Sequence, residues 1–200
     1  MSAPAVQQQL SPFIVAIGAS GAEGLNDICD LLSRLPEELA AVVLVVLHRP
    51  SDQVSHLRAV LSRASKMPVL AASDGDRFRT GRCYIGAPDA HLSLAANSNV
   101  RLVEGVAHKH RGRTVDILFE SVAAHARTRG IGIVLSGSLD DGSRGLAAIA
   151  DAGGATMVIT HHNVAQRGMP MNAIAFDGPV DVVGGAAEIA QEIVARVGRS

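Results

Sequence analysis

The stretch that decides the fold is FIVAIGASGAEGLNDICDLLSRLP, residues 13–36. Its first five residues are apolar and mostly β-branched, which is typical of a strand buried on both faces. Residues 18–21 form a tight loop of small residues. Apolar side chains then recur at helical spacing, at Leu25, Ile28, Leu32 and Leu35, until Pro36 ends the pattern. A buried strand, a tight loop and an amphipathic helix make the opening unit of an α/β sheet.

The same unit recurs along the chain. Residues 40–47 predict a second buried strand, followed by a helical stripe at Val54, Leu57, Val60 and Leu61. Further helices are expected over residues 115–126, with Thr114 as cap, after Gly142 as far as residues 153–154, and over residues 188–197. Further strands are expected at residues 131–135, 155–159 and 180–183. Continuous apolar strands separated by helices predict a doubly wound, mostly parallel sheet with helices on both faces.

The middle of the chain has a different texture. Short strand candidates occur at residues 68–72, 82–85, 91–94 and 100–103, separated by turn-forming residues at 74–76 and 97–99. We therefore expect an inserted antiparallel hairpin in this part of the α/β domain.

Composition sets further bounds. The 200 residues fit one domain, here residues 13–200 after a flexible N-terminal segment, 1–12. Eighteen Lys and Arg against 19 Asp and Glu give a net charge of −1, which argues against nucleic-acid binding. No apolar run is long enough to insert into a membrane, and the first residues do not resemble an export signal. We expect a cytoplasmic protein in which Cys29 and Cys83 stay reduced.

Three loops follow predicted strands and carry reactive side chains. Ser20 follows the first strand, His48 closes the second, and Asp141 lies in the loop SGSLDDG, residues 136–142. The ends of parallel strands meet at one edge of a sheet, where functional residues gather. A hydroxyl, an imidazole and a carboxylate are the groups that acyl transfer needs. Each also has a simpler explanation: Ser20 and the carboxylate as helix caps, and His48 as an ordinary solvated side chain.

Ordered motifs across nearly the whole chain resemble the catalytic domain of the chemotaxis protein-glutamate methylesterases, CheB. The matching motifs are Gly18-Ala19-Ser20, Leu47-His48-Arg49-Pro50, Asp74-Gly75 with Gly81, Tyr84, Ala87-Pro88 and His91, Thr114-Val115-Asp116 with Leu118-Phe119, Leu135-Ser136-Gly137 with Asp140-Asp141-Gly142, and Gly168-Met169-Pro170. The resemblance implies a doubly wound α/β fold and a serine hydrolase that demethylates γ-glutamyl methyl esters on receptor helices, releasing methanol. It also implies glutamine deamidation.

The resemblance also implies roles for four residues. Ser20 matches the nucleophile, His48 the base, and Asp141 the carboxylate that orients the base; the backbone N–H of Ser138 matches the oxyanion donor. No metal or organic cofactor is implied. The partners implied are the cytoplasmic helices of chemotaxis receptors, and whether a regulator acts in trans stays open, because no receiver domain is expected in this chain.

The chain departs from the family pattern in two loops. Gly21-Ala22-Glu23 stands where the family has Thr-Gly-Gly, and Ser138-Leu139 where it has Met-Gly. A carboxylate at Glu23 near the base would raise the pKa of the histidine by charge attraction. A catalytically weak or inactive receptor-binding domain is therefore the alternative to an active esterase.

Other interpretations have weaker support. Glycines at positions 18, 21 and 24 fit a dinucleotide-binding loop, but the only tyrosine, Tyr84, has no Lys four residues on. The G-x-S-x-G elbow of α/β-hydrolases is absent because Ala22 replaces its last glycine. His161-His162 predicts a solvent-facing loop rather than a metal site. The basic run at residues 108–113 predicts a solvated loop, with a docking surface for an acidic partner as the alternative.

Overall fold

The computed structural model describes residues 11–48, 56–86, 90–104, 113–138, 140–161, 168–176 and 178–199. The strands of the main sheet are β1 (Phe13–Ser20), β2 (Ala41–His48), β3 (Val69–Ala71), β4 (Arg82–Ile85), β7 (Gly130–Val134), β8 (Ala155–Ile159) and β9 (Val182–Gly184), and β5 (Ala90–Ala95) with β6 (Asn99–Glu104) forms a separate pair. The α-helices are α1 (Gly21–Arg34), α2 (Leu57–Ala64), α3 (Thr114–Ala126), α4 (Ser143–Asp151), α5 (Met169–Ala175) and α6 (Ala186–Gly198).

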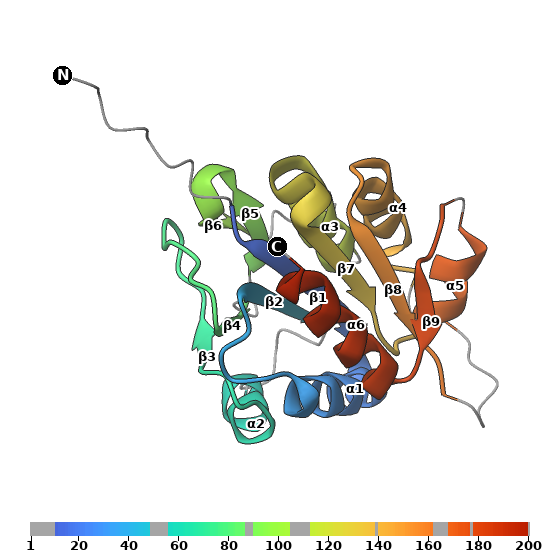
Figure 1. The fold of residues 1–200 in the computed structure, drawn as a ribbon, viewed down its shortest axis with the longest axis horizontal. Coiled ribbons are helices and arrows are strands. Elements are labelled where there is room, and N and C mark those ends of the chain that lie inside the picture. Colours follow the sequence, from blue (N-terminus) through green and yellow to red (C-terminus); the bar gives the residue numbers. More distant parts are fainter. Residues whose placement is uncertain are drawn as a thin grey trace.

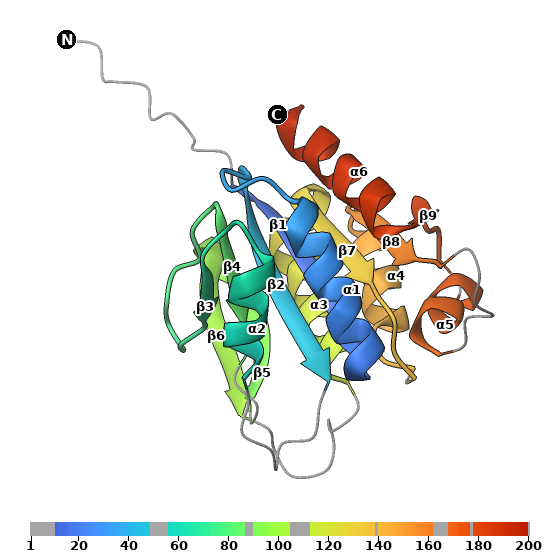
Figure 2. The ribbon, with the colours of Figure 1, turned by 90° about the horizontal axis from the view of Figure 1, so that it is seen from below.

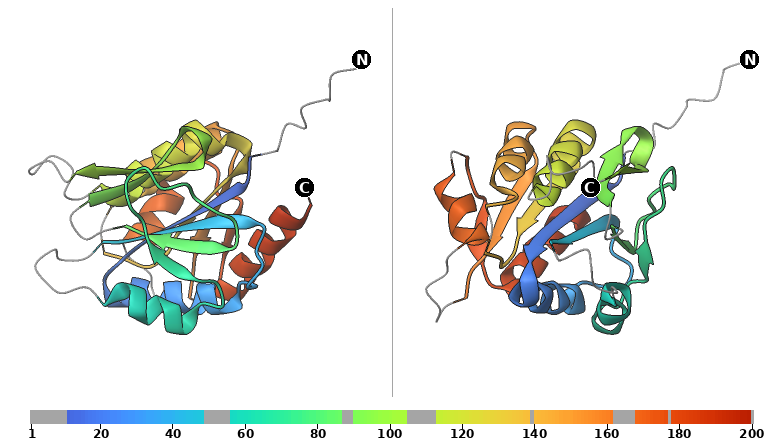
Figure 3. Two further views of the ribbon diagram at one scale, coloured as in Figure 1. Left: turned by 90° about the vertical axis from the view of Figure 1, so that its left-hand side faces the viewer. Right: turned by 180° about the vertical axis from the view of Figure 1, so that it is seen from behind.

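The main sheet is parallel throughout and has the order β3-β4-β2-β1-β7-β8-β9. Strand β1 lies at its centre, between β2 and β7 (Figure 1). Helices α1, α2 and α6 cover one face (Figure 2), while α3, α4, α5 and the β5–β6 hairpin cover the other. The side view in Figure 3 shows these three layers, with the sheet in the middle.

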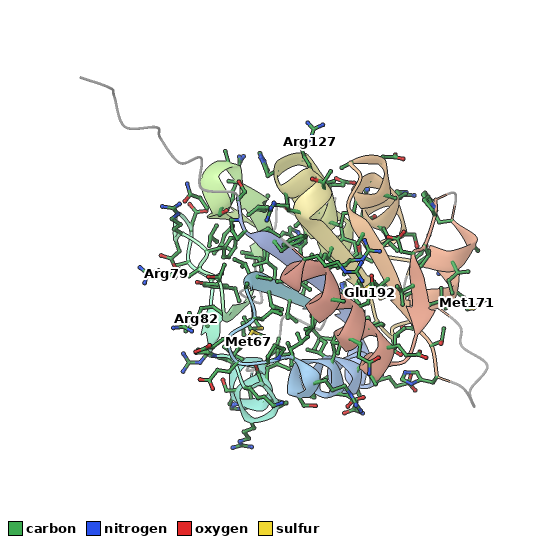
Figure 4. The ribbon with its side chains drawn as sticks, viewed as in Figure 1. Met67, Arg79, Arg82, Arg127, Met171 and Glu192 are labelled. Carbon is green, nitrogen blue, oxygen red and sulfur yellow. The ribbon has the colours of Figure 1, made fainter. Side chains whose placement is uncertain are left out.

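Alternation along β1 divides the core between the two faces. Val15, Ile17 and Ala19 are fully buried on the α1 side, whereas Ile14 and Ala16 are buried on the α3 side. Because β1 is buried on both faces, polar side chains are excluded along its length, and the first one, Ser20, stands at its carboxyl end. Charged side chains such as Arg79, Arg82 and Arg127 point outward around this core (Figure 4).

The doubly wound α/β fold predicted from the sequence is confirmed, and the hairpin insert is confirmed for β5 and β6. The hairpin prediction is wrong for the other two strands of the middle segment, β3 and β4. They extend the main sheet as parallel strands, and Val43 of β2 pairs with Cys83 of β4. Cys83, Tyr84 and Ile85 are all buried. An apolar strand of this kind is stabilised as an inner strand of the main sheet, between β3 and β2. Helix α5 was not expected from the sequence.

Both cysteines are free thiols, with Cys83 buried and Cys29 half-buried. Burial raises the pKa of Cys83 to about 12, so this thiol stays protonated and unreactive. No helix among the described residues is long and apolar enough to cross a membrane.

Candidate active site

Ser20 and His48 lie side by side at the carboxyl ends of neighbouring strands. They are register partners, the last pair of the β1–β2 ladder. Ser20 also occupies the N-cap position of α1, yet its side chain makes no capping hydrogen bond. The simpler role of Ser20 as a cap is therefore not the one that the structure shows, and its hydroxyl is left for other chemistry.

Glycines let three segments approach closely around Ser20. A Cβ on Gly137 would lie 2.6 Å from the Ser20 Cβ and 2.5 Å from the Met169 Sδ. A Cβ on Gly24 would lie 2.5 Å from the Ser136 carbonyl oxygen, and one on Gly18 would overlap Val115. The glycine spacing that suggested a dinucleotide loop is thus explained at positions 18 and 24 by packing within the protein.

Replacing Gly137 with alanine should displace Ser20. The added Cβ has no room between Ser20 and Met169, so the backbone must shift. We expect a loss of about 1–3 kcal/mol in the free energy of unfolding and a loss of more than tenfold in the esterase activity that the family resemblance implies. The matched control is Gly198→Ala at the end of α6, where a Cβ meets no atom within 4 Å. Equal activity and melting temperature for both variants would contradict the packing described.

His48 is half-buried at the end of β2, and that burial lowers the pKa of its imidazole below the ordinary value of 6.5. Desolvation disfavours the charged form of a base, so the ring is neutral near pH 7 and able to accept a proton. The sequence left open whether Glu23 lies close enough to raise this pKa. Its side chain is exposed on the first turn of α1, and burial, not a neighbouring carboxylate, determines the direction of the shift.

Asp141 is buried, with 1% of its surface exposed, and it serves as the cap of α3. Its two carboxylate oxygens accept the backbone N–H groups of Val115 and Asp116, each at 2.9 Å. Thr114, the cap expected from the sequence, is instead the first residue of the helix and makes no such bond. The pKa of Asp141 is raised to about 6, chiefly by burial and against the effect of these two hydrogen bonds.

Asp116, which was not identified from the sequence as a site residue, accepts a hydrogen bond from the loop that carries Asp141. Its Oδ1 accepts the backbone N–H groups of Gly142 at 3.1 Å and Gly145 at 2.9 Å, and Arg113 lies 3.4 Å from its Oδ2. Each of the two aspartates therefore caps the helix that begins next to the other. This reciprocal clamp fixes the loop that carries Asp141 against α3.

The two adjacent aspartates of the loop differ sharply in environment. Asp140 is exposed, with its Oδ1 3.5 Å from the Ser143 Oγ at the start of α4. Asp141 points inward. Among the described residues no hydrogen bond joins Asp141 to His48, but each carboxylate oxygen can accept a second donor. The role of Asp141 as the orienting carboxylate thus stays a prediction.

The start of the same loop is held directly against Ser20. The backbone N–H of Ser20 donates to the Ser136 carbonyl at 3.0 Å, and the N–H of Met169 donates to the Gly137 carbonyl at 2.8 Å. Gly168, with φ of +87°, lies against Gly137 and Ser138. Ser138, the predicted oxyanion donor, is exposed and follows directly on this anchored segment.

Two further polar clusters were considered from the sequence, the histidine pair 161–162 and the basic run 108–113. No group of three metal-ligating side chains gathers anywhere in the part of the chain that the structure describes. His161 is exposed as expected, but it also contacts Asp27; His162 lies outside the described residues. Of the basic run, only Arg113 is described, and it contacts Asp116 and Glu120.

Comparisons with known proteins identify one family. The sequence model of the family described as CheB methylesterase matches residues 15–193. The chain is 35% identical over 187 residues to a protein-glutamate methylesterase/protein-glutamine glutaminase of Yersinia pestis, and 32% identical to one of Salmonella typhimurium. Both alignments cover 92% of this chain and 53% of the relative, so the chain spans about half the length of these relatives.

A solved structure is similar over nearly the whole fold. The CheB methylesterase catalytic domain of Thermotoga maritima superposes with a TM-score of 0.83 at 27% identity, over 94% of this chain and 100% of that one. The central position of β1 and the two helical layers are therefore arranged as in that catalytic domain.

Proposed function

Since this chain belongs to the CheB methylesterase family, we propose that it hydrolyses γ-glutamyl methyl esters on the cytoplasmic helices of chemotaxis receptors. The observation that carries the proposal is the pairing of Ser20 with His48 at the carboxyl edge of the sheet. A serine at a helix N-cap that does not use its hydroxyl for capping is available as a nucleophile. Such a protein would work in the cytoplasm, where those receptor helices lie.

The reaction follows from these groups. Neutral His48 takes the proton of Ser20 while the Ser20 Oγ attacks the ester carbonyl, and the negative charge that develops on the oxygen is stabilised by the backbone N–H of Ser138. The protonated imidazole, oriented by Asp141, returns the proton to the leaving methoxide, and methanol departs. Water then attacks the acyl-serine with the same assistance, and glutamate is restored. No step requires a metal ion or an organic cofactor.

Deamidation of receptor glutamines uses the same groups. A γ-carboxamide presents the same carbonyl to Ser20, and ammonia leaves in place of methanol. The relatives from Yersinia pestis and Salmonella typhimurium carry both activities in their names. We therefore include glutamine deamidation in the proposal.

One observation favours a second candidate, a receptor-binding domain with weak or no catalysis. Both oxygens of Asp141 accept N–H groups of α3, and among the described residues no hydrogen bond joins Asp141 to the imidazole of His48. Labelling with an alkyl fluorophosphonate separates the two candidates, because only an activated serine displaces fluoride at phosphorus. Stoichiometric labelling at Ser20 supports the esterase, and absence of labelling supports the binding domain.

The direct test of the proposal is methanol release from a methylated receptor. Purified protein should release methanol catalytically and restore glutamate at the methylated positions. The control is the same methylated receptor, in membranes, incubated without this protein. Binding to the receptor without methanol release would favour the second candidate.

The activity should depend on pH through a group that titrates below 6.5. Protonated His48 cannot take the proton of Ser20, so kcat/KM rises with pH through the lowered pKa of His48. Asp141, with a pKa of about 6, is ionised above that pH as well. We expect kcat/KM measured between pH 5 and pH 8 to reach a plateau by about pH 7.

Glu23→Gly should leave that midpoint unchanged, because burial causes the shift of His48 and Glu23 is exposed. The contrary result is a midpoint above pH 7 in the wild-type protein and a lower midpoint in Glu23→Gly. It would show that the charge of Glu23 raises the pKa of His48.

A further inference from the structure

A carboxylate–imidazole pair, Asp27 and His161, lies at the same edge of the sheet as Ser20. Asp27 is on α1, and His161 lies two residues after the last residue of β8. The Asp27 Oδ1 is 3.1 Å from the His161 Nε2. Asp27 is largely buried, with 7% of its surface exposed, whereas the His161 side chain is 44% exposed. None of the roles implied by the family resemblance falls on either residue.

This pair is linked to Ser20 through one short segment of backbone. The other oxygen of Asp27, Oδ2, accepts the backbone N–H of Ser136 at 3.0 Å. The carbonyl of Ser136 in turn accepts the N–H of Ser20 at 3.0 Å. Gly137, the next residue, packs against the Cβ of Ser20. One carboxylate therefore joins His161 to the segment on which Ser20 rests.

The geometry excludes a catalytic triad made of Ser136, His161 and Asp27. The Ser136 Oγ is 3.4 Å from the His161 Nε2, and the same nitrogen contacts Asp27. A base that activates a hydroxyl must accept its proton at one ring nitrogen and be held by a carboxylate at the other. Ser136 is also buried. The cluster can hold atoms in place, but it cannot pass a proton from Ser136 to Asp27.

We propose that Asp27 and His161 are a positioning pair that keeps the Ser136–Gly137 segment in place beneath Ser20; this rests on the proposed esterase function. A largely buried carboxylate needs donors for both oxygens. The Ser136 N–H donates to Oδ2, and the His161 Nε2, 3.1 Å from Oδ1, is placed to donate to the other oxygen. Without His161, Asp27 can turn toward solvent and release the Ser136 N–H. Ser20 and the neighbouring Ser138 N–H would then lose their mutual alignment, on which the rate depends steeply.

The experiment compares three single variants, and then repeats His161→Ala in an Asp27→Ala background. His161→Ala removes the donor to Asp27; His161→Gln keeps an N–H at about the position of Nε2; His125→Ala, at an exposed position near the end of α3, is the control. Two rates are measured for each: the second-order rate of labelling by an alkyl fluorophosphonate, and kcat and KM for methanol release from methylated receptor.

We expect His161→Ala to slow labelling and to lower kcat together, by about ten- to a hundredfold, with little change in KM. His161→Gln should recover most of both rates, and His125→Ala should match the wild type. In an Asp27→Ala background, His161→Ala should have no further effect, because the two residues act through one contact.

Several results would overturn the proposal. Unchanged rates in His161→Ala would show that the contact does no positioning. A rise in KM with normal labelling would make His161 a substrate contact, and complete loss of labelling without recovery in His161→Gln would make it a base. Failure of the wild-type protein itself to be labelled and to release methanol would be a failure of the proposed function, which is distinguishable from these outcomes.

Discussion

Ser20→Ala should abolish methanol release and leave the fold intact. The hydroxyl is the atom that forms the bond to the acyl group, and its loss in serine hydrolases lowers kcat by about 10⁴-fold or more. Ser20 makes no side-chain capping bond to α1, so removal of its oxygen leaves no backbone donor newly unpaired. We expect the free energy of unfolding to change by less than about 0.5 kcal/mol.

The measurement is methanol release at saturating methylated receptor, with thermal unfolding of the same preparations. Ser33→Ala is the matched control, because Ser33 is an exposed serine of α1 whose hydroxyl donates to the Asp30 carbonyl. That variant should keep wild-type activity and labelling. Wild-type activity in Ser20→Ala would refute the assignment of the nucleophile.

The fold could be predicted because its information is local. The apolar run at residues 13–17 and the helical stripe that follows it specify β1 and α1 without reference to any distant residue. The membership of β3 and β4 in the main sheet could not be predicted in this way. Short strands with turn residues between them are compatible with hairpins and with parallel crossovers alike, and only the register of Val43 with Cys83 decides between them.

The candidate site was only partly predictable for the same reason. Ser20 and His48 each end an apolar run, so the rule that functional residues lie at the carboxyl ends of strands was enough to find them. The capping of α3 by Asp141 joins residues 26 positions apart, and a local pattern pointed to Thr114 instead. The contact of Asp27 with His161 joins α1 to the end of β8, and neither residue has a neighbour in sequence that would reveal it.

Asp141→Asn should lower methanol release by about 10⁴-fold if Asp141 orients His48, because an amide can hold the wrong tautomer of the imidazole. The structure adds a cost in stability. An amide oxygen can replace only one of the two carboxylate oxygens that accept the N–H groups of Val115 and Asp116, and an unpaired buried donor costs about 1–3 kcal/mol. Asp140→Asn is the control, since Asp140 is exposed, and a surface carboxylate near a helix start contributes only about 0.3–1 kcal/mol.

The pH dependence of the free energy of unfolding reports the structural role of Asp141 separately from its role in catalysis. The pKa of Asp141 is raised from 3.8 to about 6 in the folded state, so between these values the folded protein binds more protons than the unfolded chain. The contribution of Asp141 to the free energy of unfolding is therefore greatest below pH 3.8 and is lost as pH rises through about 6. Asp141→Asn should remove that slope, whereas Asp140→Asn should retain it.

Activity must then be compared at pH 7 with both variants fully folded. A loss confined to Asp141→Asn supports the orienting role. A loss of less than tenfold in that variant, with the slope in stability removed, would make Asp141 a cap of α3 and nothing more. If Asp140→Asn is the inactive variant, the correspondence of the loop with the family is displaced by one residue, and the assignment of the Ser138 N–H as oxyanion donor fails with it.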